Sequence, residues 1–220
     1  MRIAVFGTGI VGRTLAAKLD SLGHDVTVGT RDPQATLARG GEDAYGPWQR
    51  AHPAIGLAPF ADAAAGADLV VNATSGAGAL AALGAADLAG RIVLDVANPL
   101  DFSHGFPPRL DPVNDDSLGE RIQRAHPDAR VVKALNTVNC AVMVDPSRVP
   151  GRHDLFVAGN DAEAKQTVVA LLGTLGWPAD SVRDLGDITG ARATEMYLPL
   201  WLRLMSTFGT ADFNIRVTGL

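Results

Sequence analysis

Cysteine is almost absent from this sequence, because Cys140 is the only one among 220 residues. A single cysteine excludes an intramolecular disulfide and any metal site built from several cysteines. This favours a reducing, cytoplasmic setting. The sequence also has no apolar run of 18 residues, and it opens with "MRIAVFGTG" rather than with a signal-type apolar segment. We therefore expect a soluble intracellular protein that does not contact a membrane.

An excess of positive charge is missing as well. Asp and Glu total 24 against 19 Lys and Arg, which gives a net charge of -5, and the basic residues are scattered. This pattern argues against nucleic acid as a partner and favours small molecules. The spacing typical of metal ligands is lacking too. Five residues of one loop could be imagined around a metal ion, but they follow no known ligand pattern, so no metal is expected. They are Asp101, His104, Asp111, Asp115 and Asp116.

Short apolar runs alternate with helical patterns along the whole chain. Hydrophobic residues make up 47% of the sequence, which is enough for one sizeable core and a small appended lobe. The runs are continuously apolar, as expected for parallel strands that helices cover on both faces. The sequence therefore predicts an α/β, Rossmann-like doubly wound and mostly parallel sheet. We expect a helix at about 162–175, a final helix at about 189–208, and loops at 40–53, 98–116 and 145–152.

The strongest chemical signal is "GTGIVG", residues 7–12, directly after a strand and at the start of a helix. Gly7 permits a tight turn, Gly9 lets the backbone approach a pyrophosphate, and Gly12 lets helix and strand pack closely. The amides at the helix start, from Ile10 and Val11 onward, would face the pyrophosphate. The hydroxyl of Thr8 is a further candidate phosphate contact. This motif predicts a dinucleotide site.

The end of the second strand bears on the choice of cofactor. A carboxylate there would hydrogen-bond the ribose and repel a 2'-phosphate, but this chain has Thr30 and Arg31. These residues favour NADP over NAD. Arg39 is either a second phosphate contact or a solvated surface residue. A slip of one or two residues would instead bring Asp32 near the ribose.

The combination of motifs resembles the coenzyme F420-dependent NADP oxidoreductases, and it is also similar to the oxidoreductase domain of metalloreductases. The segments that carry the resemblance are "MRIAVFGTGIVGRTLAAKL", "GHDVTVGTRDP", "DLVVNATSG", "VLDVANPL", "VVKALNTV", "LFVAGNDAEAK" and "DLGDITGARATEMYLPLWLRLM". The resemblance implies an NADP-binding Rossmann domain at 1–145, a small lobe at 146–220 that closes an acceptor cleft, and often a homodimer.

It also implies hydride transfer between NADPH and a flat ring, which would be F420 or, in a flavin or ferric reductase like the metalloreductases, FAD or FMN. Such a transfer requires positioning rather than a catalytic side chain, so no catalytic residue is assigned. A module that senses NADPH without catalysis is the alternative. Loops 40–53 and 98–116 are longer than in the compact archaeal enzymes, which leaves the acceptor open.

Residues at strand ends are the candidates for the nicotinamide end of the cofactor. They are Asn72, Ala73, Thr74, Asn98 and Pro99. Asn136, at the next strand end, is a further cofactor-site candidate and a plausible donor to the acceptor ring. Asn72 and Asn98 would alternatively tie turns through side-chain to backbone bonds. Lys133 is either a functional group or a strand-end lysine with a buried stem.

Acceptor specificity is expected in the loop after "VANPL". Phe102, His104, Phe106 and Arg109 there offer stacking surfaces and charge. We expect the final helix to belong to the core or to a dimer interface, and only as a second possibility to form a wall of the acceptor pocket. We also expect Pro199 to kink it.

Overall fold

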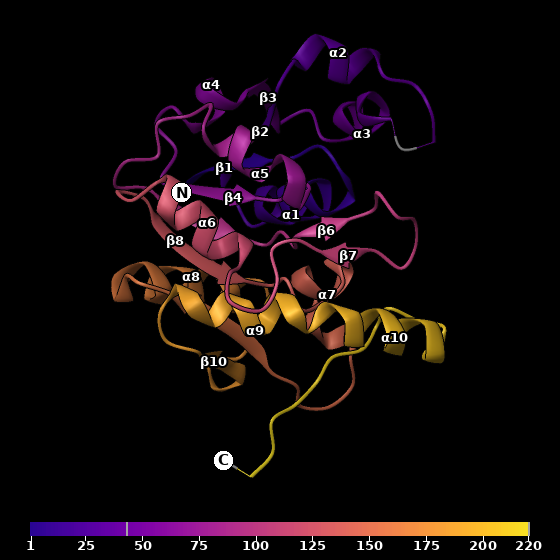
Figure 1. Ribbon diagram of the computed structural model, residues 1–220. Coiled ribbons are helices and arrows are strands. Elements are labelled where there is room, and N and C mark those ends of the chain that lie inside the picture. Colours follow the sequence, from indigo (N-terminus) through magenta and orange to yellow (C-terminus); the bar gives the residue numbers. More distant parts are fainter. Residues whose placement is uncertain (43, 220) are drawn as a thin grey trace.

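The computed structural model describes residues 1–42 and 44–219, and Figure 1 shows their arrangement around one central sheet. The sheet has eight strands in the order β10-β9-β8-β5-β4-β1-β2-β3. The strands are β1 Arg2–Phe6, β2 Asp25–Thr30, β3 Gly56–Pro59, β4 Leu69–Asn72, β5 Ile92–Asp95, β8 Arg130–Ala134, β9 Leu155–Gly159 and β10 Val182–Asp184, with β6 Leu100–Asp101 and β7 Arg109–Leu110 in a separate antiparallel pair.

The helices are α1 Ile10–Ser21, α2 Pro33–Ala38, α3 Tyr45–Ala51, α4 Phe60–Ala64, α5 Gly76–Leu83, α6 Leu118–Ala125, α7 Cys140–Val144, α8 Ala162–Thr174, α9 Ala191–Met196 and α10 Leu198–Phe208. Three short 3-10 turns lie at η1 Pro146–Arg148, η2 Ala179–Ser181 and η3 Ile188–Gly190. The predicted Rossmann-like fold class is confirmed.

Alternate side chains of each strand divide between two apolar layers. Ile3 and Val5 of β1 pack into the layer formed with α1, α3, α7 and α8, whereas Ala4 and Phe6 pack into the layer with α4, α5 and α6. Phe6 meets Phe60 of α4 at a ring-centroid distance of 4.7 Å. Both faces are therefore covered, which is why the strands read as continuous apolar runs.

Strands β1, β4, β5 and β8 run parallel to one another, so their carboxyl ends meet at one edge of the sheet. The register places Phe6 beside Asn72, Asn72 beside Asp95, and Asp95 beside Lys133. In parallel α/β sheets, ligands bind outside this edge. The strand-end residues singled out above are thus brought together by the topology.

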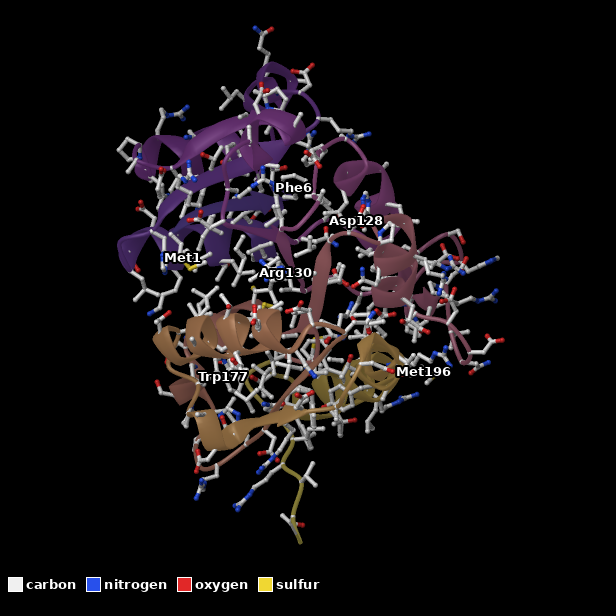
Figure 2. The ribbon with its side chains drawn as sticks, turned by 90° about the vertical axis from the view of Figure 1, so that its left-hand side faces the viewer. Met1, Phe6, Asp128, Arg130, Trp177 and Met196 are labelled. Atoms are coloured by element: carbon white, nitrogen blue, oxygen red, sulfur yellow. The ribbon has the colours of Figure 1, made fainter. Side chains whose placement is uncertain are left out.

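The second half of the chain extends the same sheet. β9 pairs antiparallel with β8, with Gly159 opposite Val132, and β10 pairs parallel with β9. In Figure 2 the ribbon that carries Trp177 and Met196 lies below the ribbon that carries Phe6. α9 and α10, yellow in Figure 1, run across one side of this lower part. Because one sheet joins both parts, the division into domains 1–145 and 146–220 stays a prediction.

Three segments differ from the sequence-based expectation. The predicted loop 40–53 contains α3, in which Tyr45 is buried and Trp48 packs against Tyr45 and His52; Pro47 is tolerated because it lies in the first helical turn. The predicted loop 98–116 contains the β6–β7 pair. The predicted final helix is broken at Tyr197, and Pro199 lies in the first turn of α10.

Candidate active site

The glycine turn between β1 and α1 is sterically determined. Gly7 has φ +122°, and a Cβ there would lie 2.4 Å from the Ala73 carbonyl oxygen. A Cβ at Gly12 would lie 2.1 Å from the Gly7 oxygen, so α1 can approach the turn only without a side chain. A Cβ at Gly9, in contrast, would meet nothing within 4 Å. Gly9 therefore presents its backbone to open space, as a phosphate contact requires.

The N-terminus of α1 is available to an anion. Gly9 is its N-cap residue, and within the described chain no side chain caps it and no acidic residue lies in its first turn. The unpaired amides and the positive end of the helix dipole of this 12-residue helix therefore favour a negatively charged group. Ile10 is 63% exposed beside this end, and it lines a cavity together with Val11. A pyrophosphate fits this position chemically.

Thr30 and Arg31 at the end of β2 differ in orientation. Thr30 is buried, and its Oγ1 lies 2.8 Å from Oγ1 of Thr36 in α2. Arg31 is exposed, and it makes no ion pair within the part of the chain that the structure describes. The Asp32 carboxylate accepts from the Ala35 amide at 2.9 Å and caps α2. Arg39, the C-cap residue of α2, is exposed as well. Of the residues considered for the adenosine ribose and its 2'-phosphate, Arg31 and Arg39 are therefore the ones whose charged groups remain available.

The side chain of Asn72 is engaged inside the protein. It is fully buried, and its Nδ2 donates to Oδ1 of Asp95 at 2.8 Å. Its Oδ1 accepts from the Thr74 hydroxyl at 2.7 Å. The same Oδ1 accepts from the Thr74 amide at 3.4 Å, which is the side-chain to backbone bond of the turn-tying interpretation. Ala73 and Thr74, rather than Asn72, line the cavity.

Asn98 and Asn136 form a reciprocal pair across the edge of the sheet. Nδ2 of Asn98 donates to the Asn136 carbonyl at 2.8 Å, and Nδ2 of Asn136 donates to Oδ1 of Asn98 at 3.0 Å. The preceding residue, Leu135, is fully buried and has a left-handed φ of 64°, a conformation that non-glycine residues rarely adopt. Because such strain persists only where packing enforces it, the turn after β8 places Asn136 firmly opposite Asn98.

Lys133 is enclosed completely. Its Nζ lies 2.8 Å from Oδ2 of Asp95 and 2.8 Å from Oε1 of Glu195, and it donates to the Ala97 carbonyl. Burial alone would lower the pKa of Lys133, but the two carboxylates raise it above its ordinary value. The ammonium therefore stays charged at neutral pH, and Lys133 holds structure together rather than reaching a ligand.

Glu195 is the partner that the sequence analysis did not connect to this edge. Its two carboxylate oxygens accept from the Leu118 and Gly119 amides at 2.8 and 3.1 Å, at the start of α6. It thereby ties α9 to the N-terminus of α6 and to β8 at once. No local sequence pattern predicts this ion pair, because 62 positions separate Lys133 from Glu195.

A cavity of about 330 Å³ adjoins the glycine turn. Its walls come from the α1 start, the ends of β4 and β5, the turn after β8, α7, α10 and the loop after β5. They comprise Ile10, Val11, Ala73, Thr74, Ser75, Gly76, Val96, Ala97, Asn98, Leu100, Phe102, Asn136, Thr137, Val138, Asn139, Cys140, Met143, Leu198 and Trp201. Among these described residues there is no Asp, Glu, Lys, Arg or His.

The cavity includes some of the expected acceptor residues and not others. Phe102 lines it, whereas His104, Phe106 and Arg109 do not, and Phe106 is 70% exposed. Leu198 and Trp201 of α10 form part of the wall. The cavity therefore supports the second of the two roles expected for the final helix, that of a wall of the acceptor pocket. Gly76 lines the cavity but was not among the residues expected from the sequence. A Cβ there would lie 2.4 Å from the Asn98 backbone oxygen. The segment "SGAG" after a strand is the sequence pattern that could have indicated this glycine.

The described residues, 1–42 and 44–219, contain no cluster of three or more His, Cys, Asp or Glu side chains able to hold a metal ion. None of their helices combines the length and the apolar character needed to cross a bilayer.

Comparison with known proteins gives consistent results. A family model described as "NADP oxidoreductase coenzyme F420-dependent" matches residues 2–99. A crystal structure of a candidate F420-dependent NADP reductase from Arthrobacter sp. FB24 is 59% identical, covers the whole of both chains and superposes with a TM-score of 0.95.

Two curated proteins are more distant relatives. The F420-dependent NADP reductase of Methanocaldococcus jannaschii is 34% identical over 137 residues, which are 61% of this chain and 59% of that protein. The metalloreductase STEAP3 of Rattus norvegicus is 27% identical over 207 residues, which are 91% of this chain and 38% of that protein. The chain thus matches less than two thirds of the length of either one.

Proposed function

The chain belongs to the coenzyme F420-dependent NADP oxidoreductase family, and on this premise we propose that it transfers a hydride between NADPH and a deazaflavin of the F420 type. The activity is that of an NADP-dependent oxidoreductase, and its partners are small redox molecules. A homodimer and a cytoplasmic location are part of the proposal.

One observation carries the choice of reaction: no ionisable side chain other than Cys140 lines the described walls of the cavity beside the glycine turn. Reduction of a carbonyl or an imine benefits from a positioned proton donor. Transfer between two rings needs only distance, alignment and exclusion of water. An apolar cavity with a few amide and hydroxyl groups supports the second kind of reaction.

Different residues would bind different parts of NADPH. The N-terminus of α1 and the Gly7–Gly9 turn would hold the pyrophosphate, because no side chain caps the amides at the start of α1 and Gly9 faces open space. Arg31 would hold the 2'-phosphate through charge-assisted hydrogen bonds. Thr74, Asn98 and Asn136 would orient the carboxamide end. Bound NADPH supplies the hydride, and the deazaflavin supplies the carbon that accepts it.

The far wall of the cavity would position the acceptor. Phe102, Leu198 and Trp201 offer flat or apolar surfaces there, and they would keep water away from the hydride. Trp201 is itself held by stacking on Phe213, at a ring-centroid distance of 5.5 Å. The rigid wall would thus fix the acceptor ring against the nicotinamide.

Stereospecific isotope transfer tests the proposal. NADPH deuterated on one face of the reactive nicotinamide carbon should deliver its label to F420, and the isotopomer labelled on the other face should deliver none, because the rings meet in one orientation. The label would be followed by mass spectrometry of the reduced deazaflavin.

The other outcomes choose between functions. Turnover of FAD, FMN or a ferric chelate without reaction of F420 would favour a flavin or ferric reductase, in line with the similarity to the rat metalloreductase. Tight NADPH binding with no oxidation by any of these acceptors would favour a sensor of NADPH.

A further inference from the structure

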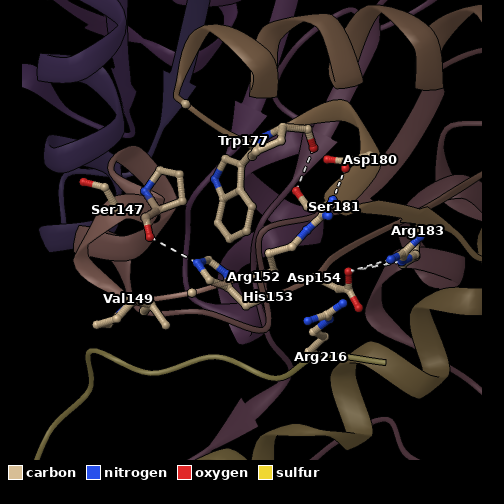
Figure 3. Close-up of a pocket in the computed structure, with 15 residues that line it drawn as sticks. Ser147, Val149, Arg152, His153, Asp154, Trp177, Asp180, Ser181, Arg183 and Arg216 are labelled. Atoms are coloured by element: carbon tan, nitrogen blue, oxygen red, sulfur yellow. Dashed lines mark hydrogen bonds and ion pairs between the residues drawn. The ribbon is translucent and has the colours of Figure 1, made fainter. Parts of the chain in front are cut away.

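A second and larger cavity lies away from the nucleotide cleft. Its volume is about 670 Å³, within the range of small-molecule sites. Most residues of the segments 146–154 and 176–183 line it, together with Arg216 of the C-terminal segment (Figure 3), and Arg148 is not among them. It shares no lining residue with the cavity described above. Trp177 lines this second cavity, and its Nε1 donates at 3.0 Å to the carbonyl of Met143, a residue of the other cavity.

Two of the three arginines around this cavity already have partners. The guanidinium of Arg183 binds Oδ1 of Asp154 at 3.0 and 3.1 Å, and Arg152 pairs with Asp180. Arg216 lies beside Asp154 in Figure 3, and its charge helps to lower the pKa of that carboxyl, which burial alone would raise. Asp154 is thus shared by Arg183 and Arg216, and the three arginines that line the cavity face two aspartates, Asp154 and Asp180.

The backbone on both sides of Arg216 is anchored to one residue. The Asp154 amide donates to the Ile215 carbonyl at 2.9 Å, and the Val217 amide donates to Oδ2 of Asp154 at 2.7 Å. Asp154 is only 2% exposed. The C-terminal segment thus presents Arg216 at the cavity from a fixed position, although the side chain itself is exposed.

The buried His153 beside it adds no charge. Nδ2 of Asn214 donates to the Asp154 carbonyl at 2.8 Å, which fixes the amide orientation, and the same Nδ2 lies 3.0 Å from Nδ1 of His153. Nδ1 must then accept, while Nε2 donates to the Pro146 carbonyl at 3.1 Å. This pattern defines a neutral imidazole. The side chains of the cavity therefore sum to one net positive charge in a protein of net charge -5.

We propose that this cavity binds a small anionic molecule through a carboxylate or phosphate group held by Arg216. A planar guanidinium donates two parallel hydrogen bonds to either group. Arg152 and Arg183, held in place by their aspartates, would add to the positive potential around the ligand. Binding would also fasten the C-terminal segment, because the ligand would join Arg216 to the loop 146–154.

Calorimetric titration of the NADPH-saturated protein tests this site, because bound NADPH blocks its own phosphate contacts. Inorganic phosphate and citrate are the two probes, and the tighter one identifies the preferred group. We expect one equivalent to bind to the unchanged protein and at least tenfold weaker binding in Arg216→Ala, since a charge-assisted contact is lost. Arg216→Lys should recover part of the affinity. Arg203→Ala, an exposed arginine of α10 outside the cavity, should bind as the unchanged protein does.

A second readout follows the C-terminal segment itself. Phosphate or citrate should slow hydrogen exchange at the Val217 amide in the unchanged protein and not in Arg216→Ala. Absence of binding by both probes, or equal affinity in Arg216→Ala and the unchanged protein, would overturn the proposal. Circular dichroism of each variant checks that the fold is retained.

Discussion

The ammonium of Lys133 lies 2.8 Å from the Glu195 carboxylate and joins β8 of the nucleotide-binding sheet to α9. Both side chains are excluded from solvent, and Asp95 completes the buried group. α10, which follows α9, forms part of the cavity wall through Leu198 and Trp201. This ion pair therefore connects the wall of the acceptor cavity to the strand ends beneath it.

Lys133→Met should destabilise the protein by about 3–5 kcal/mol, because it leaves two buried carboxylates unpaired. Urea unfolding measures this loss. Lys18→Met, a change at a half-buried position in the last turn of α1, is the control and should cost little. The double variant Lys133→Met/Glu195→Gln should cost less than the sum of the single variants. Additive costs in this cycle would contradict the coupling.

Arg31→Ala should weaken NADPH binding about tenfold or more and leave NADH binding nearly unchanged, since a charge-assisted contact with the 2'-phosphate is lost. Thr30→Val should have little effect on the preference, because the Thr30 hydroxyl is bonded to Thr36 inside the protein. Fluorescence titration with both nucleotides measures this. Equal affinity of the unchanged protein for NADPH and NADH would refute the role of Arg31.

Gly9→Val and Gly12→Ala should fail in different ways. The side chain at position 9 would enter open space where the pyrophosphate is expected, so NADPH binding should disappear while the unfolding midpoint stays the same. A Cβ at position 12 would collide with the Gly7 oxygen and should cost about 1–3 kcal/mol of stability. Retained NADPH affinity in Gly9→Val would rule out this placement of the nucleotide.

Phe102→Ala should weaken binding of the acceptor about three- to tenfold, because a stacking surface is removed. Phe106→Ala is a matched control in the same loop, since Phe106 lies outside the cavity. NADPH affinity should be unchanged in both variants. Steady-state kinetics with varied F420 separates them, and identical Michaelis constants in the two variants would exclude Phe102 from the acceptor site.

Asp116 should make stability depend on pH in the acid range. Partial burial alone would raise the pKa of Asp116, but hydrogen bonds from Arg121, Arg124 and the Ser117 amide outweigh it and lower the pKa from 3.8 to about 2. A lowered pKa means that the folded form binds fewer protons than the unfolded form, so the contribution is complete above about pH 5 and is lost as the pH falls toward 2.

Asp116→Asn should therefore cost about 1–2 kcal/mol at pH 7 and progressively less below pH 4. Urea unfolding at pH 7, 4 and 3 measures the trend. Asp115→Asn, the neighbouring change at an exposed position, is the control and should cost little at pH 7. A cost of Asp116→Asn that is the same at all three pH values would show that these ion pairs do not set the acid stability.

The sequence alone determined the class of fold and the kind of cofactor. Continuous apolar strands, each followed by a helical pattern, can be buried on both faces only in a sheet covered by helices, and the spacing of Gly7, Gly9 and Gly12 has a local steric cause. These features depend on neighbours along the chain, so they are readable from it. The same locality allowed the loops to be recognised by composition, although Gly46 and Pro47 concealed α3 because a first helical turn tolerates proline.

Tertiary structure alone decided which side chains are engaged and which are available. Asn72 and Thr30 carry the residue types of a binding site, yet both are turned to buried partners, Asp95 and Thr36. The pairing of Lys133 with Glu195 and the contribution of α10 to the cavity depend on how distant segments pack. A buried polar group forms a hydrogen bond with whichever partner the packing places within reach. For these residues the partners come from other strands and helices.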